Sequence, residues 1–126
     1  MRGQSKSQPE FLTLLSPESV VPAGHPLRPI RLMTDVALKG LSPVFERMYV
    51  AFGRPSIAPE KLLRALLLQI LYSIRSERML MEQLEYNLLF RWFVGLNMDE
   101  PVWVPTVFSK NRDRLLEGDS RAEVIR

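Results

Sequence analysis

The hydrophobic residues of this chain recur at helical spacing, most clearly between residues 59 and 74. Pro59 suits the first turn of a helix, because its missing N–H would have no intrahelical partner there. Glu60 adds a carboxylate near the positive end of the helix dipole. Seven apolar residues then follow at helical spacing: Leu62, Leu63, Leu66, Leu67, Ile70, Leu71 and Ile74. They cover more than a narrow stripe, so we predict a helix that is buried on most sides.

The polar residues 75–78 interrupt this pattern, and apolar residues at 79, 80, 81, 84 and 88 restart it. The second helix is predicted over about 78–87, and it continues or restarts over 88–94 before Gly95. Two helices joined by a tight polar turn indicate either a helix-turn-helix or a plain αα-hairpin. The spacing alone does not separate these two possibilities.

The same periodicity predicts two helices earlier in the chain and one later. The first covers about 27–39 and ends at Gly40, with four residues facing inward: Ile30, Met33, Val36 and Ala37. The next covers about 43–50 behind Ser42 as N-cap, with Phe45, Met48 and Tyr49 on its inner face. The last covers about 107–117, with Thr106 as N-cap and Gly118 at its end.

The remaining segments are predicted to be connectors. Three prolines and a glycine between residues 16 and 26 favour an extended segment there, and residues 52–55 form a turn. We expect an all-α fold of about five helices with a helix-turn-helix-like core. Residues 1–10 form a flexible tail, 11–119 a single helical domain in which residues 11–15 dock on the core, and 120–126 the truncated start of a missing catalytic domain.

Composition places the chain among soluble globular proteins, since 46% of its residues are hydrophobic and 25% are charged. The net charge of +3 is compatible with nucleic-acid binding but also with many other functions. The polar N-terminus lacks the apolar segment of a signal peptide, and the run over 62–74 is too short to cross a bilayer. A cytoplasmic protein with no membrane partner is therefore expected.

The chain has few residues that are suited to catalysis. The chain has no cysteine and one histidine, His25, which suits a surface or capping role better than a general base or a metal ligand. Its acidic residues lie on predicted helix surfaces beside basic residues, whereas a two-metal nuclease site needs carboxylates that converge from different elements. We therefore expect no cofactor and no catalytic residue in this chain.

The last predicted helix carries the clearest candidate binding residues. Its first half contains Ser109, Lys110, Asn111, Arg112 and Arg114, with Thr106 before them. A helix that docks in the major groove of DNA holds one face in the core and presents arginine, asparagine and lysine on the other. The alternative is a solvated helix face with the charges of any small domain.

Four segments, in this order, resemble the N-terminal domain of bacterial transposases of the insertion-sequence-five group. They are residues 21–28, residues 54–78, Tyr-Asn-Leu-Leu-Phe-Arg-Trp-Phe-Val-Gly-Leu at 86–96, and Phe-Ser-Lys-Asn-Arg-Asp-Arg-Leu-Leu at 108–116. The resemblance covers nearly the whole chain, from about residue 11 to 119. One departure is clear, since the family usually has Asp-His-Ser-Thr before Phe-Ser-Lys-Asn-Arg, where this chain has Val-Pro-Thr-Val at 104–107.

The resemblance implies a domain that recognises double-stranded DNA at terminal inverted repeats and helps to assemble the transposition complex. Cutting and joining would belong to a downstream ribonuclease-H-like domain whose Asp-Asp-Glu triad holds two magnesium ions. No residue of this chain matches that triad. This chain alone is therefore expected to lack activity.

Two main hypotheses follow. In the first, the last helix binds DNA, and four more cations contact phosphates: Arg54, Arg64, Arg75 and Arg78. In the second, the leucine-rich helix and the aromatic residues Phe90, Trp92 and Phe93 pair with a second copy or with a full-length transposase. The aromatic residues also suit an ordinary core. The truncation and the change at 104–107 would equally fit an inactive transposase remnant.

Overall fold

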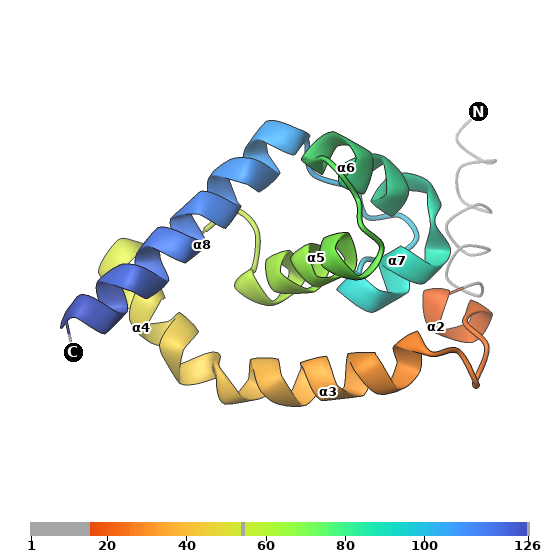
Figure 1. Ribbon diagram of the computed structural model, residues 1–126, viewed down its shortest axis with the longest axis horizontal. Helices are drawn as coiled ribbons and strands as arrows, with labels where there is room; N and C mark the ends of the chain where they lie inside the picture. The colour runs from red at the N-terminus through yellow and green to blue at the C-terminus, as the bar shows by residue number, and fades with distance from the viewer. Residues whose placement is uncertain (1–15, 54, 126) are drawn as a thin grey trace, which may run out of the picture.

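The computed structural model describes residues 16–53 and 55–125, which form seven helices and no strand (Figure 1). The helices are α2 (Pro17–Val20), α3 (Leu27–Gly40), α4 (Ser42–Phe52), α5 (Pro59–Leu71), α6 (Glu77–Tyr86), α7 (Leu88–Val94) and α8 (Pro105–Ile125). The predicted all-α fold is confirmed. The predictions for residues 1–15 and for Arg54 lie outside the described residues.

Helix α5 is the centre of the domain, as the leucine pattern predicts. It packs against α7 and α8, α6 contacts both of these helices, and α4 reaches the far half of α8 (Figure 1). Ala65 and Leu68 of α5 are completely buried. The expectation that α5 is buried on most sides is wrong at its C-terminal end, because Ile70 is 74% exposed and Leu71 and Tyr72 are also exposed.

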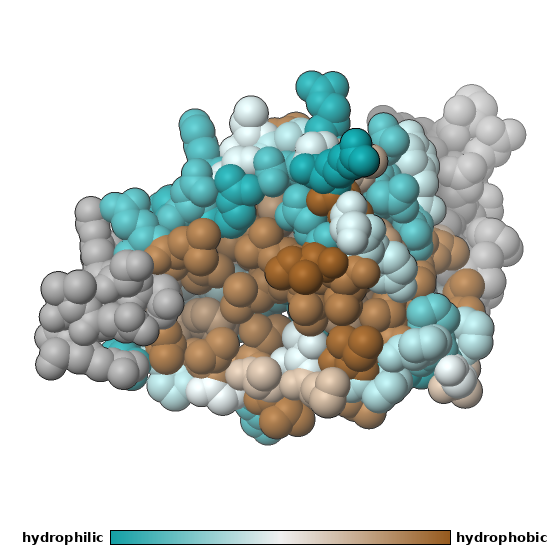
Figure 2. All heavy atoms as spheres, viewed as in Figure 1, coloured by the Kyte–Doolittle hydropathy of each residue, from teal (hydrophilic) through white to brown (hydrophobic). Residues whose placement is uncertain are grey.

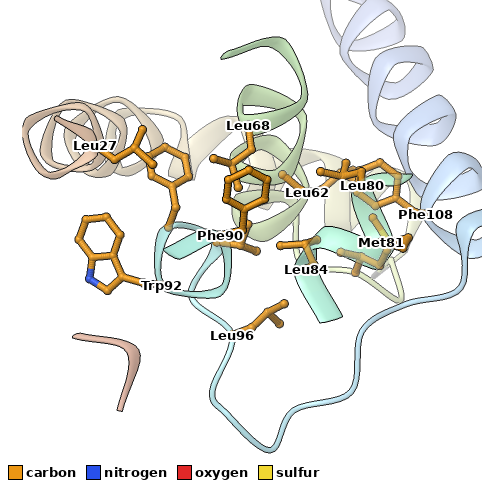
Figure 3. Close-up of a cluster of buried hydrophobic side chains, with 14 of the residues drawn as sticks. Leu27, Leu62, Leu68, Leu80, Met81, Leu84, Phe90, Trp92, Leu96 and Phe108 are labelled. Carbon is orange, nitrogen blue, oxygen red and sulfur yellow. The ribbon is translucent and has the colours of Figure 1, made fainter. Parts of the chain in front are cut away.

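The core gathers side chains from α5, α6 and α7, and α8 closes it with Phe108 (Figure 3). Phe90, Trp92 and Phe93 of α7 are all buried, which confirms the core assignment of the aromatic residues. Trp103 lies before α8 and stacks on Phe108 with 6.2 Å between the ring centroids. Contacts between sequentially distant elements, such as that of Phe108 with the core of α5, α6 and α7, hold short helices in place.

Caps define the breaks between α5, α6 and α7. The Ser76 hydroxyl accepts a hydrogen bond from the N–H of Met79 at the start of α6, and the Asn87 side chain does the same for Phe90 at the start of α7. Asn87 therefore restarts the helix after α6. Gly95 follows α7 with a φ of 92°, and the Leu96 N–H donates to the Arg91 carbonyl, as in the usual glycine-terminated helix end.

Several predicted boundaries are wrong. Residues 17–20 form the short helix α2, since Pro17 starts a helix as readily as it ends one. Ser42 lies inside α4 and makes no capping bond, because α3 passes into α4 through Leu41 with helical dihedrals. Helix α8 begins at Pro105, so Thr106 is in its first turn, and the helix continues past Gly118, which costs a helix only about 1 kcal/mol.

Helix α3 is the largest departure from the predicted packing. Ile30 is half-buried, but Met33, Val36 and Ala37 were expected inside and are exposed. The inner side of α3 instead has Leu27 and Leu38 at its two ends. Periodicity identified the apolar stripe correctly but could not show which side of the helix faces the core.

Candidate nucleic-acid interface

The first half of α8 divides into an inner and an outer side. Phe108 and Asn111 are buried, and Leu115 is half-buried. The outer side carries Thr106, Lys110, Asp113, Arg114 and Glu117, all exposed. The sequence prediction of one anchored and one exposed face is therefore correct for α8, but the residues are distributed differently.

Asn111 belongs to the inner side and has its hydrogen bonds inside the protein. Its Oδ1 accepts from the backbone N–H of Ile57 at 3.2 Å, and its Nδ2 donates to Ser56 Oγ at 2.9 Å and to the Val107 carbonyl at 2.8 Å. The residue is 5% exposed. An asparagine that reads adenine needs the same amide atoms free. We therefore assign Asn111 to the joint between α8 and the segment before α5, in correction of its predicted base contact.

Glu77 joins the start of α6 to α8. Its Oε2 accepts from Arg112 Nη1 at 2.7 Å, and its Oε1 accepts from Ser109 Oγ at 3.5 Å. Arg112 also pairs with Asp113 at 3.2 Å. Ser109 and Arg112, both predicted DNA contacts, are thus engaged within the protein, and a phosphate would have to compete with Glu77 for Arg112.

Two further predicted cations lie at the start of α6, and one of them, Arg78, is close to the start of α8. Arg78 follows Glu77 directly, and Arg75 precedes the Ser76 cap. Arg78 also lines a shallow hollow together with Trp103 and Pro105, at the start of α8. The N-terminal ends of α6 and α8 therefore lie side by side, as Figure 1 also shows.

Three of these cations remain available to a ligand. Arg75, Arg78 and Lys110 are exposed and form no ion pair with any residue in the described part of the chain. We name these three cations, together with Thr106, the α6–α8 face, because they lie on the first turns of two helices that contact each other, or directly before them. Figure 2 shows hydrophilic side chains gathered over these two helices. Arg114 is exposed one turn beyond Lys110, beside a small apolar cavity that Leu115 and Met48 also line.

The basic character is confined to the helix starts. Glu82 and Glu85 are exposed further along α6, and Asp113 and Glu117 are exposed further along α8. Acidic side chains repel phosphates, so the C-terminal half of α6 is a poor element to enter a DNA groove. Only the start of α6, with Arg75 and Arg78, therefore offers cations to a nucleic acid.

Arg64, another predicted phosphate contact, lies elsewhere. Arg64 of α5 donates to Asp35 of α3 and lies 3.5 Å from the Phe93 carbonyl oxygen, with its side chain 15% exposed. It holds α3 against the core and is not on the α6–α8 face. Arg54 lies outside the described residues.

A cluster that the sequence did not reveal joins α2, α3 and α7. The guanidinium groups of Arg28 and Arg31 lie 5.0 and 4.7 Å from the ring centroid of Trp92. Glu18 accepts hydrogen bonds from Trp92 Nε1 and from Arg28, both at 2.7 Å. The hydrogen bonds from Trp92 and then Arg28 lower the pKa of Glu18 below its ordinary value. Arg28 and Arg31 are therefore engaged in contacts within the fold.

The described residues contain no cluster of three histidine, cysteine or acidic side chains that could hold a metal ion. His25 accepts a hydrogen bond at Nδ1 from the N–H of Leu27 at 3.1 Å, which confirms its predicted capping role. Across the same described residues, no helix combines the length and apolar character needed to span a membrane.

The described residues thus form an all-helical domain with exposed cations at the starts of two adjoining helices. A family model described as a transposase domain (DUF772) matches residues 15–114, which is most of the chain. The chain belongs to this transposase domain family. No curated protein and no solved structure matches it.

Proposed function

We propose that this chain is the DNA-recognition domain of an insertion-sequence transposase of the insertion-sequence-five group. In this proposal it binds double-stranded DNA at the terminal inverted repeats of the element. One observation supports the proposal: in a transposase-family domain, Glu77 joins the start of α6, next to the exposed cations Arg75 and Arg78, to the part of α8 that carries the exposed Lys110.

Helix α8 would provide the recognition element. Its N-terminal turn exposes Thr106, and the helix dipole favours a phosphate there. Lys110 and Arg114 lie one and two turns further along and are suited to phosphates or guanine edges. Arg75 and Arg78 would contact the flanking backbone. Asn111 and Arg64 are not contacts in this proposal, because both are used within the fold.

The described residues contain no cluster of acidic side chains that could hold the metal ions for cutting and joining of DNA. We assign these reactions to a catalytic domain elsewhere with an Asp-Asp-Glu triad and magnesium. The cytoplasm is the proposed site of action.

The test is a mobility shift of the purified chain on the terminal inverted repeat that flanks its gene, with a scrambled duplex as competitor. Selective binding is expected, and Arg78→Ala with Lys110→Ala should weaken it at least tenfold. Each lost phosphate contact flattens the log–log salt dependence by about 0.9, so this double variant should flatten it by about 1.8.

The matched control is Lys39→Ala with Arg47→Ala. These two cations are also exposed and form no ion pair with described residues, but they lie on α3 and α4. The control removes the same net charge and should change affinity less than twofold. Equal losses in both double variants would mean that only net charge matters, and absence of selective binding by the folded protein would contradict the proposal.

A protein-interaction module is the second candidate function. The aromatic residues of α7 do not support it, because they are buried. Exposed apolar side chains elsewhere do, including Val36 of α3 and Ile70 of α5 (73% and 74% exposed). Figure 2 shows that apolar side chains gather over α5, α4 and α3 on one face of the molecule.

A further inference from the structure

The Glu77 carboxylate lies among groups that bind anions. Arg112 Nη1 donates to its Oε2 at 2.7 Å, and Ser109 Oγ lies 3.5 Å from its Oε1. Along the chain, the exposed Arg75 comes two residues before Glu77, and the exposed Arg78 follows it directly. Guanidinium and hydroxyl groups donate to phosphate oxygens as well as to carboxylates. Glu77 therefore occupies two donors that would also suit a phosphate.

The fold has other means of holding α6 beside α8. Phe108 of α8 belongs to the same buried cluster as Leu80 and Met81 of α6 (Figure 3). The start of α6 is capped by the Ser76 hydroxyl, so the Glu77 carboxylate is not needed as a cap. The two helices can therefore stay adjacent when the ion pair between Glu77 and α8 opens.

This ion pair is accessible from solvent. The side chains of Arg112 and Glu77 are 26% and 29% exposed. An ion pair that keeps this much contact with water stabilises a fold only slightly, because water screens its charges. The contact of Ser109 at 3.5 Å is also longer than the distance of about 2.8 Å that is typical for a hydroxyl donor. A second anion can therefore replace Glu77 at little cost to the fold.

The pair adjoins the α6–α8 face. Lys110 lies between Ser109 and Arg112 in the sequence and is exposed on α8. A DNA strand carries a phosphate about every 3.4 Å along the helix axis. A strand that contacts Lys110 therefore brings further phosphates toward Arg112. The Glu77 carboxylate repels these phosphates for as long as it stays in place.

We propose that Glu77 is an internal competitor for DNA. In the free protein it occupies Ser109 and Arg112, and a phosphate of the duplex displaces it and takes over both donors. This inference rests on the proposed DNA binding and adds to it two contacts that are closed in the free protein. Arg112 has an anionic partner before and after the exchange, whereas Glu77 loses its partner and stays close to the phosphate. Glu77 therefore lowers the affinity of the chain for DNA.

Mobility shifts on the terminal inverted repeat at fixed salt test the competition. Glu77→Gln should bind at least threefold more tightly than the wild type, because the neutral amide neither holds Arg112 as an ion pair nor repels the phosphate. Glu82→Gln is the matched control, since it removes the same charge from an exposed position of α6, and it should change the affinity less than twofold.

The outcomes separate this inference from the proposed function. If the wild type binds selectively and Glu77→Gln binds no more tightly than it, the competition is overturned and the proposed function remains. Equal gains in Glu77→Gln and Glu82→Gln would also overturn the competition, because net charge alone would explain them. Absence of DNA binding by the wild type and by Glu77→Gln, both folded, would overturn both proposals.

Arg112 provides a second measurement that does not require a change at Glu77. Arg112→Ala should flatten the log–log salt dependence by about 0.9, the value for one phosphate contact. In this background, Glu77→Gln should give no gain beyond the control, because the donor for which it competes is gone. An unchanged salt dependence in Arg112→Ala would mean that the pair only joins the helices, and would overturn the inference. Circular dichroism establishes that each variant is folded under the assay conditions.

Discussion

The indole Nε1 of Trp92 donates a hydrogen bond of 2.7 Å to the Glu18 carboxylate, across 74 residues of sequence. Glu18 is the residue through which α2, α3 and α7 are joined, since it also accepts from Arg28. Its carboxylate is largely exposed and still has well-placed donors on two sides. The contact therefore couples folding of the N-terminal helices to the protonation state of Glu18.

Stability is accordingly expected to depend on pH through Glu18. Because the folded-state pKa is lowered, the carboxylate stabilises the fold above its ordinary pKa of 4.5, and this contribution is lost as pH falls through the folded value. Glu18→Gln should lower the melting temperature at pH 7, and its difference from the wild type should shrink below pH 4.5. Glu82→Gln on α6, an exposed acid without an ion pair in the described chain, should show no such dependence. A pH-independent difference for Glu18→Gln would contradict this.

Asn111→Ala should destabilise the domain by about 1–3 kcal/mol, because it leaves the buried N–H of Ile57 without an acceptor. Chemical denaturation measures this change. Lys110→Ala on the exposed side of the same helix should cost less than about 0.5 kcal/mol. If Asn111→Ala keeps full stability but loses DNA affinity, its assignment to the inner joint is wrong.

Arg64 and Asp35 should show energetic coupling in a double-mutant cycle with alanine, on the order of 1 kcal/mol, since Asp35 is partly solvated. Arg64→Ala should destabilise the fold, yet the salt dependence of DNA binding by the folded variant should match that of the wild type. A flatter salt dependence would restore Arg64 as a phosphate contact.

The turn between α5 and α6 contains one residue with a strained backbone conformation, Ser73, and its substitution should relieve the strain. Ser73 has a φ of 53°, and the Ile74 N–H donates to the Gln69 carbonyl, so Ser73 occupies a position that glycine normally takes. Ser73→Gly should stabilise the protein by about 0.5–1 kcal/mol, after the entropy cost of glycine in the unfolded chain. Ser42→Gly within α4 should instead destabilise it by up to about 1 kcal/mol. Thermal unfolding of both variants distinguishes these outcomes.

The sequence was sufficient for most of the local structure, although it missed α2 and misplaced the starts of α4 and α8. Leucine spacing identified α5, Ser76 and the polar residues around it marked the break before α6, and Gly95 marked the end of α7. These features depend on propensities and caps that act within a few residues. The candidate face was only partly predictable. The sequence named Lys110, Arg78 and Arg75, but it named Arg64 and Arg112 beside them, and the fold uses those two in ion pairs.

Tertiary structure alone decided the environment of each side chain. Whether Asn111 reads a base or bonds to Ile57 depends on a contact 54 residues away. The direction in which α3 turns its apolar stripe depends on Arg64 and Glu18, which bind the polar side of that helix. A periodic pattern shows that a helix has two different sides. The partners that each side meets depend on contacts between distant residues, which no local spacing encodes.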